Sequence, residues 1–231
     1  MPQIVYGLDI ETDTRTDAVD PAIAPVVTVA LSGRNFDEVF VGPEADLLVA
    51  LDRRLASLAP GVIATWNGST FDLPFIADRA RLLGLDLGLQ LCVDPRLTMQ
   101  RALLPGHGGA YRAAWHGHTH IDTFRLYGQP NGSGHWGSLR VIGRVLGLTP
   151  APTAGGPRGR AQILTNEALH AHAPSDARLA RNLAERRWSA AHRLIDRVEP
   201  LEVQPVSVAA HRLERQARLD RSREDHRGEG E

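Results

Sequence analysis

The opening stretch of the chain constrains its fold more than any other feature. Residues Ile4 to Thr12 form an apolar, strand-like run that ends with two carboxylates, Asp9 and Glu11. Strand residues two positions apart project to the same face, so these carboxylates are expected side by side. Like charges so close need a counter-charge, and Mg²⁺ or Mn²⁺ is the usual one for oxygen ligands. The stretch therefore predicts a strand that carries a metal site, although acidic pairs at strand ends are more often simply solvated.

The composition is that of an ordinary globular protein. The 231 residues are 42% hydrophobic and 23% charged, enough for one α/β domain with or without a tail. A formal net charge of −1 excludes a globally basic nucleic-acid binder but not a local basic groove. The single Cys92 cannot form an internal disulfide, and neither a signal peptide nor a bilayer-length apolar run is evident. We expect a cytoplasmic protein with no membrane partner.

The hydrophobic periodicity predicts a five-stranded mixed sheet flanked by helices. Three strand-like runs with short links, at 4–12, 25–31 and 38–42, indicate an antiparallel meander. The runs that follow alternate between helical and strand patterns, which implies parallel strands. They are a helix at 44–58, a strand at 62–66, a helix at 71–83, a strand at 118–124 and a helix at 139–148.

The remaining segments are less regular. Residues 85–117 are rich in Gly, Pro and Arg, and we expect loops there with a short helix near 95–104. Residues 149–160 read as a loop, and residues 166–198 as a helix interrupted at Pro174. The expected organisation is one domain over residues 1–200 and a charged, disordered tail over residues 201–231.

A third carboxylate follows the strand predicted at 62–66. In the stretch Trp66 to Ile76, Asp72 begins a helix beside the carboxyl end of a strand that is expected next to the first one. It would then face Asp9 and Glu11. The alternatives are that Asp72 only caps its helix and that Asn67 is only a turn residue.

A fourth carboxylate and an imidazole occur late in the chain. His172 and Asp176 are four residues apart, which on a helix would place them on one face. Four carboxylates and a histidine are what two-metal phosphodiester hydrolysis requires, the histidine accepting the proton of the attacking water.

These segments resemble the three exonuclease motifs of the DEDD superfamily, and the second is most similar to that of the 3′–5′ proofreading domain of family B DNA polymerases. The resemblance rests on Asp9-Ile10-Glu11, on Asn67 to Ile76, on Asp176 with a preceding ring residue, and on the segments His120 to Asp122 and Ser138 to Gly147. It covers roughly residues 4–183, in the right order.

The resemblance implies an RNase H-like fold and removal of nucleotides from 3′ ends with two divalent cations, Mg²⁺ or Mn²⁺. The metal-binding carboxylates would be Asp9, Glu11, Asp72 and Asp176. In the polymerase-type domain a Tyr precedes the last Asp by four residues, and here that position is His172; the His-bearing branch would place its His at Ala171. We expect His172 to orient the water, with His170 as the next candidate.

For several other residues the sequence is compatible with either a structural or a functional role. We expect Thr12, Asn67 and Phe71, which lie within the motifs, to contact substrate, although Phe71, like Trp66 and Phe75, reads first as a core residue. His116, His118 and His120 alternate and could bind a transition metal, but an edge strand with solvated histidines is favoured. Trp115 and Trp136 are the better candidates for base stacking. The loop arginines that could line a phosphate path are Arg101, Arg112, Arg158 and Arg160.

Together these features predict a 3′–5′ exonuclease acting on the single-stranded 3′ end of a nucleic acid, DNA favoured, and releasing nucleoside 5′-monophosphates. We expect it to act as a stand-alone domain, since the rest of the chain is too short for a polymerase domain. One alternative is an exoribonuclease acting on short RNA. The other is a binding module that lacks turnover, which is disfavoured because a binder gains nothing from clustered carboxylates facing phosphates.

Overall fold

The structure is a computed structural model that describes residues 4–15, 17–94, 104–127, 138–148 and 166–195; for residues 166–172 it describes the backbone alone. Within these residues the strands are β1 (Val5–Thr12), β2 (Val26–Gly33), β3 (Phe36–Phe40), β4 (Val62–Thr65), β5 (Leu89–Val93), β6 (Tyr111–Trp115) and β7 (His118–Asp122). The helices are α1 (Glu44–Ser57), α2 (Asp72–Leu82), α3 (Phe124–Tyr127), α4 (Leu139–Val145), α5 (Asn166–Arg186) and α6 (Trp188–Ala191), with a 3-10 turn over His192–Leu194.

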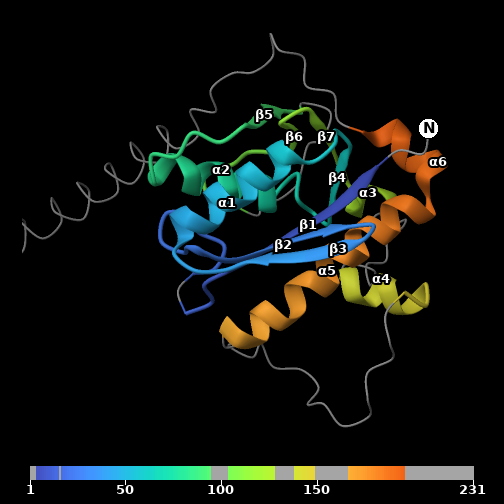
Figure 1. Cartoon of the computed structure of the whole chain (residues 1–231), viewed down its shortest axis with the longest axis horizontal. Coiled ribbons are helices and arrows are strands. Elements are labelled where there is room, and N and C mark those ends of the chain that lie inside the picture. Colours follow the sequence, from blue (N-terminus) through green and yellow to red (C-terminus); the bar gives the residue numbers. More distant parts are fainter. Residues whose placement is uncertain (1–3, 16, 95–103, 128–137, 149–165, 196–231) are drawn as a thin grey trace, which may run out of the picture.

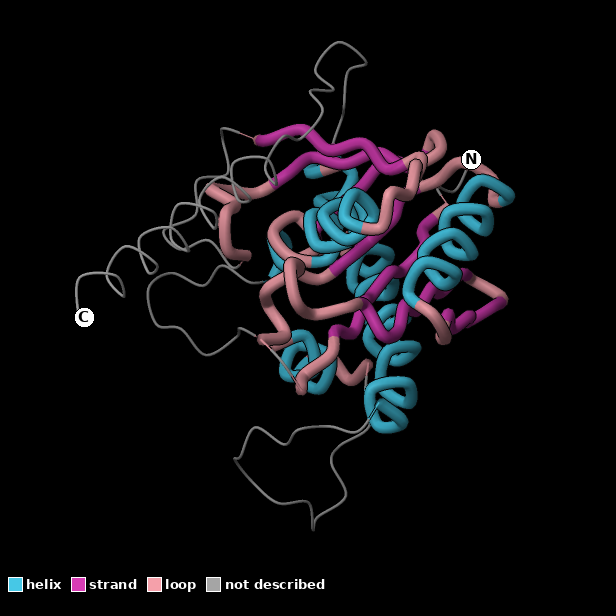
Figure 2. The backbone as a smooth tube through the Cα atoms, turned by 90° about the vertical axis from the view of Figure 1, so that its left-hand side faces the viewer, coloured by secondary structure: helices cyan, strands magenta, loops and turns pink. Residues whose placement is uncertain are grey.

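The strands form one mixed sheet in the order β3-β2-β1-β4-β7-β6-β5. The first three strands are an antiparallel meander, and β4 and β7 join β1 in parallel. The predicted fold class, an α/β fold with an antiparallel meander and parallel strands, is therefore confirmed. Helices lie on both sides of the strands (Figures 1 and 2), so β1, β4 and β7 in the middle of the sheet are buried on both faces.

The predicted number of strands is wrong, because the segment expected to form loops contains two of them. β5 pairs with β6 from Leu89↔Trp115 to Val93↔Tyr111, and β6 joins β7 through a tight hairpin. The hairpin turn is His116-Gly117, with φ of 46° and 80°, the left-handed conformation that two-residue hairpins use. Both strands are short, and cross-strand pairing stabilises them more than intrinsic strand propensity does. The short helix expected near 95–104 falls almost entirely outside the described residues.

One face of the sheet packs against α1 and α2. The β1 side chains Tyr6, Leu8 and Ile10 alternate onto this face, which is why they point away from Asp9 and Glu11. They pack in one core with four buried leucines of α1 and with apolar residues of the first part of α2. These residues are Leu47, Leu48, Leu51, Leu55, Leu73, Phe75 and Ile76.

The opposite face is covered by α5, with α4 beside it (Figure 1). The expected interruption at Pro174 is wrong, because the α5 backbone runs through it without a break. A proline inside a helix removes one backbone hydrogen bond. The helix is nevertheless held along the sheet by its small and apolar residues, of which Ala173, Ala177 and Ala184 are fully buried, and this packing outweighs the local cost.

The expected boundary between the domain and its tail, near residue 200, lies outside the described residues. So does the loop expected at 149–160. Among the helices that the structure describes, none combines the length and the apolar character needed to span a bilayer.

Candidate active site

The site lies on the C-terminal half of β1. Asp9 and Glu11 alternate with Leu8 and Ile10, so that both carboxylates project to the face covered by α5. Both side chains are only partly buried, whereas the strand residues between and before them are buried. The expected side-by-side arrangement of the two carboxylates is therefore present.

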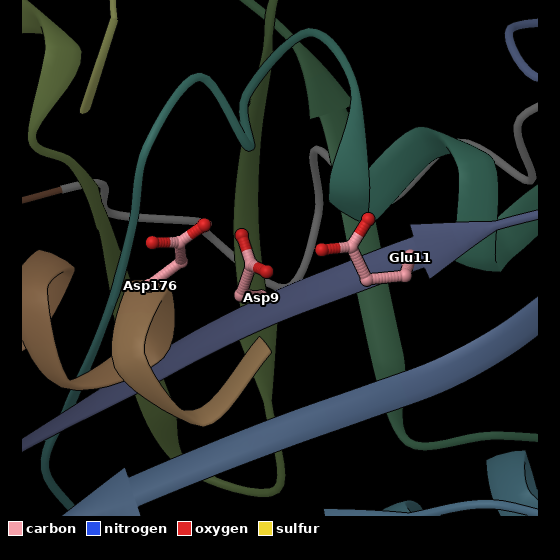
Figure 3. A group of neighbouring side chains, drawn as sticks. All are labelled: Asp9, Glu11 and Asp176. Atoms are coloured by element: carbon pink, nitrogen blue, oxygen red, sulfur yellow. The ribbon is translucent and has the colours of Figure 1, made fainter. Parts of the chain in front are cut away.

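Asp176, on α5, adds a third carboxylate from a distant part of the sequence. One carboxylate oxygen of each of Asp9, Glu11 and Asp176 lies within 4.8 Å of the others. Figure 3 shows Asp176 on its helix directed toward the side chains on β1. The close approach of α5 depends on Gly7, where an added Cβ would lie 1.8 Å from the carbonyl oxygen of Ala177. A small residue on the strand thus brings the two halves of the site together.

Asp72 stands beside this group of three, at the first residue of α2. It is 4% exposed, and its Oδ1 accepts the backbone N–H of Ile10 at 3.2 Å. That N–H is available because β4 pairs with β1 only as far as Gly7 and has ended before Ile10 is reached. Asp72 therefore does more than cap its helix, because its carboxylate forms a hydrogen bond between the start of α2 and β1, at the residue next to Asp9.

Burial, with a further contribution from mutual repulsion, raises the pKa values of the clustered carboxylates. Burial raises the pKa of Asp9 well above its ordinary value, and the charges of Asp72, Glu11 and Asp176 raise it further. Burial together with the charge of Asp176 raises the pKa of Glu11 to about 7. Burial also raises the pKa of Asp72 to about 7, against the opposing hydrogen bonds from its own N–H and that of Ile10. Such a cluster is costly to ionise unless a cation neutralises it.

Arg140 on α4 is a member of the site that the sequence analysis missed. Its Nε lies 3.2 and 3.1 Å from the two carboxylate oxygens of Asp176, and its Nη2 lies 2.7 Å from Oδ2. The charge of Arg140 lowers the pKa of both Asp9 and Glu11. No sequence signal distinguishes Arg140 from the other arginines of the chain, because the contact depends on how α4 packs against α5.

A buried aspartate holds the loop that leads to Asp72. Asp122, at the end of β7, accepts the backbone N–H groups of Asn67, Ser69 and Phe124 at 2.7, 3.2 and 3.0 Å. Asn67 has a left-handed φ of 68°, and its side-chain oxygen accepts the hydroxyl of Thr70 at 2.8 Å. Asn67 is therefore a turn residue, as one of the alternatives proposed, and Asp122 stabilises that turn.

The other residues expected to contact substrate lie at different places. Phe71 packs partly against the main core, with its ring 5.4 Å from that of Phe75. The Thr12 hydroxyl donates to the carbonyl of Ala18 at 2.8 Å, and Thr12 is buried whereas Glu11 is only partly buried. Thr12 is the last residue of β1, and its hydroxyl is thus bonded to the turn that follows and not to the carboxylate group.

The backbone at His172 and His170 is part of α5, with His172 four positions before Asp176. The side chains of both lie outside the described residues, as do Trp136 and three of the expected loop arginines, Arg101, Arg158 and Arg160. The fourth, Arg112, is partly buried and donates to the thiol of Cys92 at 3.4 Å.

Two interpretations of the sequence need correction, one structural and one functional. The strand that carries His118 and His120 is not an edge strand, because β7 lies between β4 and β6 and buries both rings. His118 uses both ring nitrogens, toward the N–H of Gly61 and the carbonyl of Leu55, which leaves no nitrogen for a metal. Trp115 is not available for base stacking, since it is 1% exposed and donates to Asp52 at 2.7 Å.

The sheet order and the carboxylates gathered at the end of its first strand define an RNase H-like α/β domain with a candidate metal-binding acidic site. Residues 38–129 match the family model described as DNA polymerase family B, exonuclease domain. That range includes Asp72 and Asp122, whereas Asp9, Glu11, Arg140 and Asp176 lie outside it.

Two further comparisons agree with that match. DNA polymerase 2 of Aeropyrum pernix is 31% identical over 104 residues, which cover 40% of this chain and 12% of that protein. The family B DNA polymerase of Pyrobaculum calidifontis superimposes with a TM-score of 0.58 at 18% identity, covering 80% of this chain and 24% of the polymerase. The chain thus spans a small part of either protein. The resemblance to a family B proofreading exonuclease domain, first drawn from short motifs, is confirmed.

Proposed function

We propose that this chain is a divalent-cation-dependent 3′–5′ exonuclease that removes nucleoside 5′-monophosphates from the single-stranded 3′ end of a nucleic acid. The observation that carries the proposal is the convergence of Asp9, Glu11 and Asp176, with oxygens within 4.8 Å of one another and Asp72 beside them. Asp9 and Glu11 come from β1, Asp72 from the start of α2 and Asp176 from α5, late in the chain. A structural role does not account for the gathering, because clustered carboxylates oppose folding.

The residues fit Mg²⁺ or Mn²⁺. All the candidate ligand atoms are carboxylate oxygens, the donors that these hard cations prefer. Asp9, Glu11 and Asp176 would hold one cation, and Asp72 would complete the ligand set for a second. Two bound cations supply an activated water and stabilisation of the leaving oxygen in phosphodiester hydrolysis.

The protein would supply the positioning and the proton acceptor. His172 lies one helical turn before Asp176 along the α5 backbone, and we propose that it orients the attacking water and accepts its proton. Asn67 and Phe71 lie on the turn just before Asp72 and would contact the terminal nucleotide. DNA is the favoured substrate because the similar proteins are DNA polymerases.

The test uses the full-length protein and a single strand labelled at its 5′ end, as DNA and as RNA, with Mn²⁺, Mg²⁺ or EDTA. We expect a ladder of progressively shorter labelled products with either cation, faster on DNA, and none in EDTA. Faster digestion of RNA would favour the exoribonuclease alternative. Undiminished cleavage in EDTA, or cutting of a closed circular strand, would exclude this mechanism.

The non-catalytic alternative predicts tight binding of the same strands without products. Asp9→Asn separates the two possibilities, with Asp86→Asn, an exposed carboxylate after α2, as the matched control. In an exonuclease, Asp9→Asn abolishes products and Asp86→Asn leaves them unchanged. In a binding module neither protein forms products, and Asp9→Asn strengthens binding because it removes a negative charge that faces phosphates.

A further inference from the structure

Arg140 is held over the carboxylate group by the packing of a short helix. Leu139 and Ile142 of α4 are buried against Leu179 and Leu183 of α5, and this contact fixes Arg140 beside Asp176. The guanidinium contacts both oxygens of that carboxylate, with Nε at 3.2 and 3.1 Å and Nη2 at 2.7 Å. Contacts of one guanidinium with both oxygens are among the stronger and more directional ion pairs in proteins.

The position of Arg140 places its positive charge in the field of the whole cluster and not of Asp176 alone. The Asp176 carboxylate that the guanidinium contacts has an oxygen within 4.8 Å of carboxylate oxygens of Asp9 and Glu11, and the same positive charge lowers the pKa of both. It therefore does electrostatically what a bound cation would do, which is to offset the repulsion among carboxylates.

Arg140 and a divalent cation are then in competition. The guanidinium contacts both oxygens of Asp176, including the one that lies within 4.8 Å of the other carboxylates, and two positive charges a few ångströms apart repel each other. The side chain of Arg140 is 46% exposed while that of Asp176 is 13% exposed, so the arginine can swing into solvent and leave the aspartate in place.

We propose that Arg140 is the resident counter-ion of the carboxylate group and that a divalent cation binds by displacing its guanidinium from Asp176. The inference rests on the proposed function, since it concerns the same site. It assigns to Arg140 a positioning and regulatory role: the arginine stabilises the cation-free protein and sets how much cation is needed to load the site.

The experiment measures Mn²⁺ binding by titration calorimetry and the melting temperature in EDTA for Arg140→Gln, which removes the charge. Arg178→Gln is the matched control, because Arg178, on α5, also pairs with an aspartate, Asp37, but on the surface and away from the carboxylate group. We expect Arg140→Gln to bind Mn²⁺ at least about tenfold more tightly and to melt at a lower temperature in EDTA. Arg178→Gln is expected to bind Mn²⁺ as the wild type does.

Arg140→Lys keeps the positive charge but cannot contact both oxygens of Asp176 in the way that a guanidinium does. It should fold even if Arg140→Gln fails to fold. It is expected to bind Mn²⁺ more tightly than the wild type and less tightly than Arg140→Gln. Equal or weaker Mn²⁺ binding in the Arg140 variants would overturn the inference and make Arg140 a support that orients Asp176 for the cation.

Failure of this inference is distinguishable from failure of the proposed function. A wild type that digests 3′ ends while Arg140→Gln gains no affinity overturns the inference alone. A wild type that binds Mn²⁺, gains affinity on Arg140→Gln and never digests a strand overturns the exonuclease alone. Absence of Mn²⁺ binding in the wild type and in both variants overturns both.

Discussion

Gly7 on β1 lies so close to Ala177 on α5 that the strand and the helix are almost in backbone contact; a Cβ on Gly7 would be 1.8 Å from the Ala177 carbonyl oxygen. Gly7 is two residues before Asp9, and Ala177 follows Asp176. The spacing between the two halves of the carboxylate group is therefore set by the absence of a side chain at residue 7.

Gly7→Ala is expected to destabilise the protein by about 3 kcal/mol or more, because backbone atoms must move to admit the methyl group. The displacement of α5 should also weaken Mn²⁺ binding, since Asp176 moves away from Asp9. Urea unfolding and calorimetry measure the two effects. Gly108→Ala, where nothing lies within 4 Å of the added Cβ, is the control and should change stability by less than about 0.5 kcal/mol.

The three N–H groups that Asp122 accepts divide between its two oxygens. Oδ1 accepts Asn67 and Phe124, and Oδ2 accepts Ser69. Asp122→Asn keeps an oxygen for the first two and loses the third, so a loss of about 1 kcal/mol is expected, against about 2–4 kcal/mol for Asp122→Ala. Thermal unfolding checks the order, and equal losses in the two variants would contradict this account of the turn before Asp72.

The stability of the cation-free protein is expected to fall as the pH rises from about 5 to about 8. Glu11 and Asp72 have pKa values of about 7 in the folded protein, above the values of about 4 that carboxyl groups have in an unfolded chain. Between these values the folded state binds more protons than the unfolded state, so raising the pH favours unfolding. Urea midpoints measured in EDTA across this range test the direction.

Saturating Mn²⁺ should remove or reverse that pH dependence, because the cation binds the ionised carboxylates and competes with their protons. The Kd for Mn²⁺ is expected to decrease as the pH rises through about 7. A Kd that stays constant from pH 5 to pH 8 would show that Glu11 and Asp72 are not ligands.

Asp9→Asn is expected to abolish the stabilisation by Mn²⁺ and yet to make the cation-free protein more stable at pH 8, by about 1–3 kcal/mol. The amide resembles the protonated carboxyl group that the raised pKa of Asp9 favours, and it relieves repulsion with Glu11, Asp72 and Asp176. Melting temperatures with EDTA and with Mn²⁺ measure both effects. Asp86→Asn should show neither, and a less stable Asp9→Asn protein in EDTA would contradict the electrostatic argument.

His172→Ala is expected to leave Mn²⁺ binding intact while lowering the rate of digestion by ~10²–10⁴-fold, the usual contribution of a positioned acid–base group. His170→Ala is the control and should retain the wild-type rate. The opposite result would assign the role to His170, and full rates in both variants would mean that neither histidine accepts the proton.

The sequence by itself determined the elements that carry strong local signals. The alternation in residues 4–12 and the leucine spacing in residues 44–58 are local, so β1 and α1 followed directly from them, as did the shared face of Asp9 and Glu11. Short motifs in the right order were enough to indicate the family resemblance. They also singled out Asp72 and Asp176, because motif spacing along the chain does not depend on knowing the fold.

Tertiary structure alone decided the contacts between segments with no local signal. β5 and β6 form because they pair with each other and β6 pairs with β7, and α5 continues through Pro174 because its small residues pack on the sheet. Nothing in the sequence distinguishes Arg140 from the other arginines; it contacts Asp176 because α4 packs against α5. A sequence pattern reports the preferences of neighbouring residues, whereas long-range packing decides which side chains of distant segments meet.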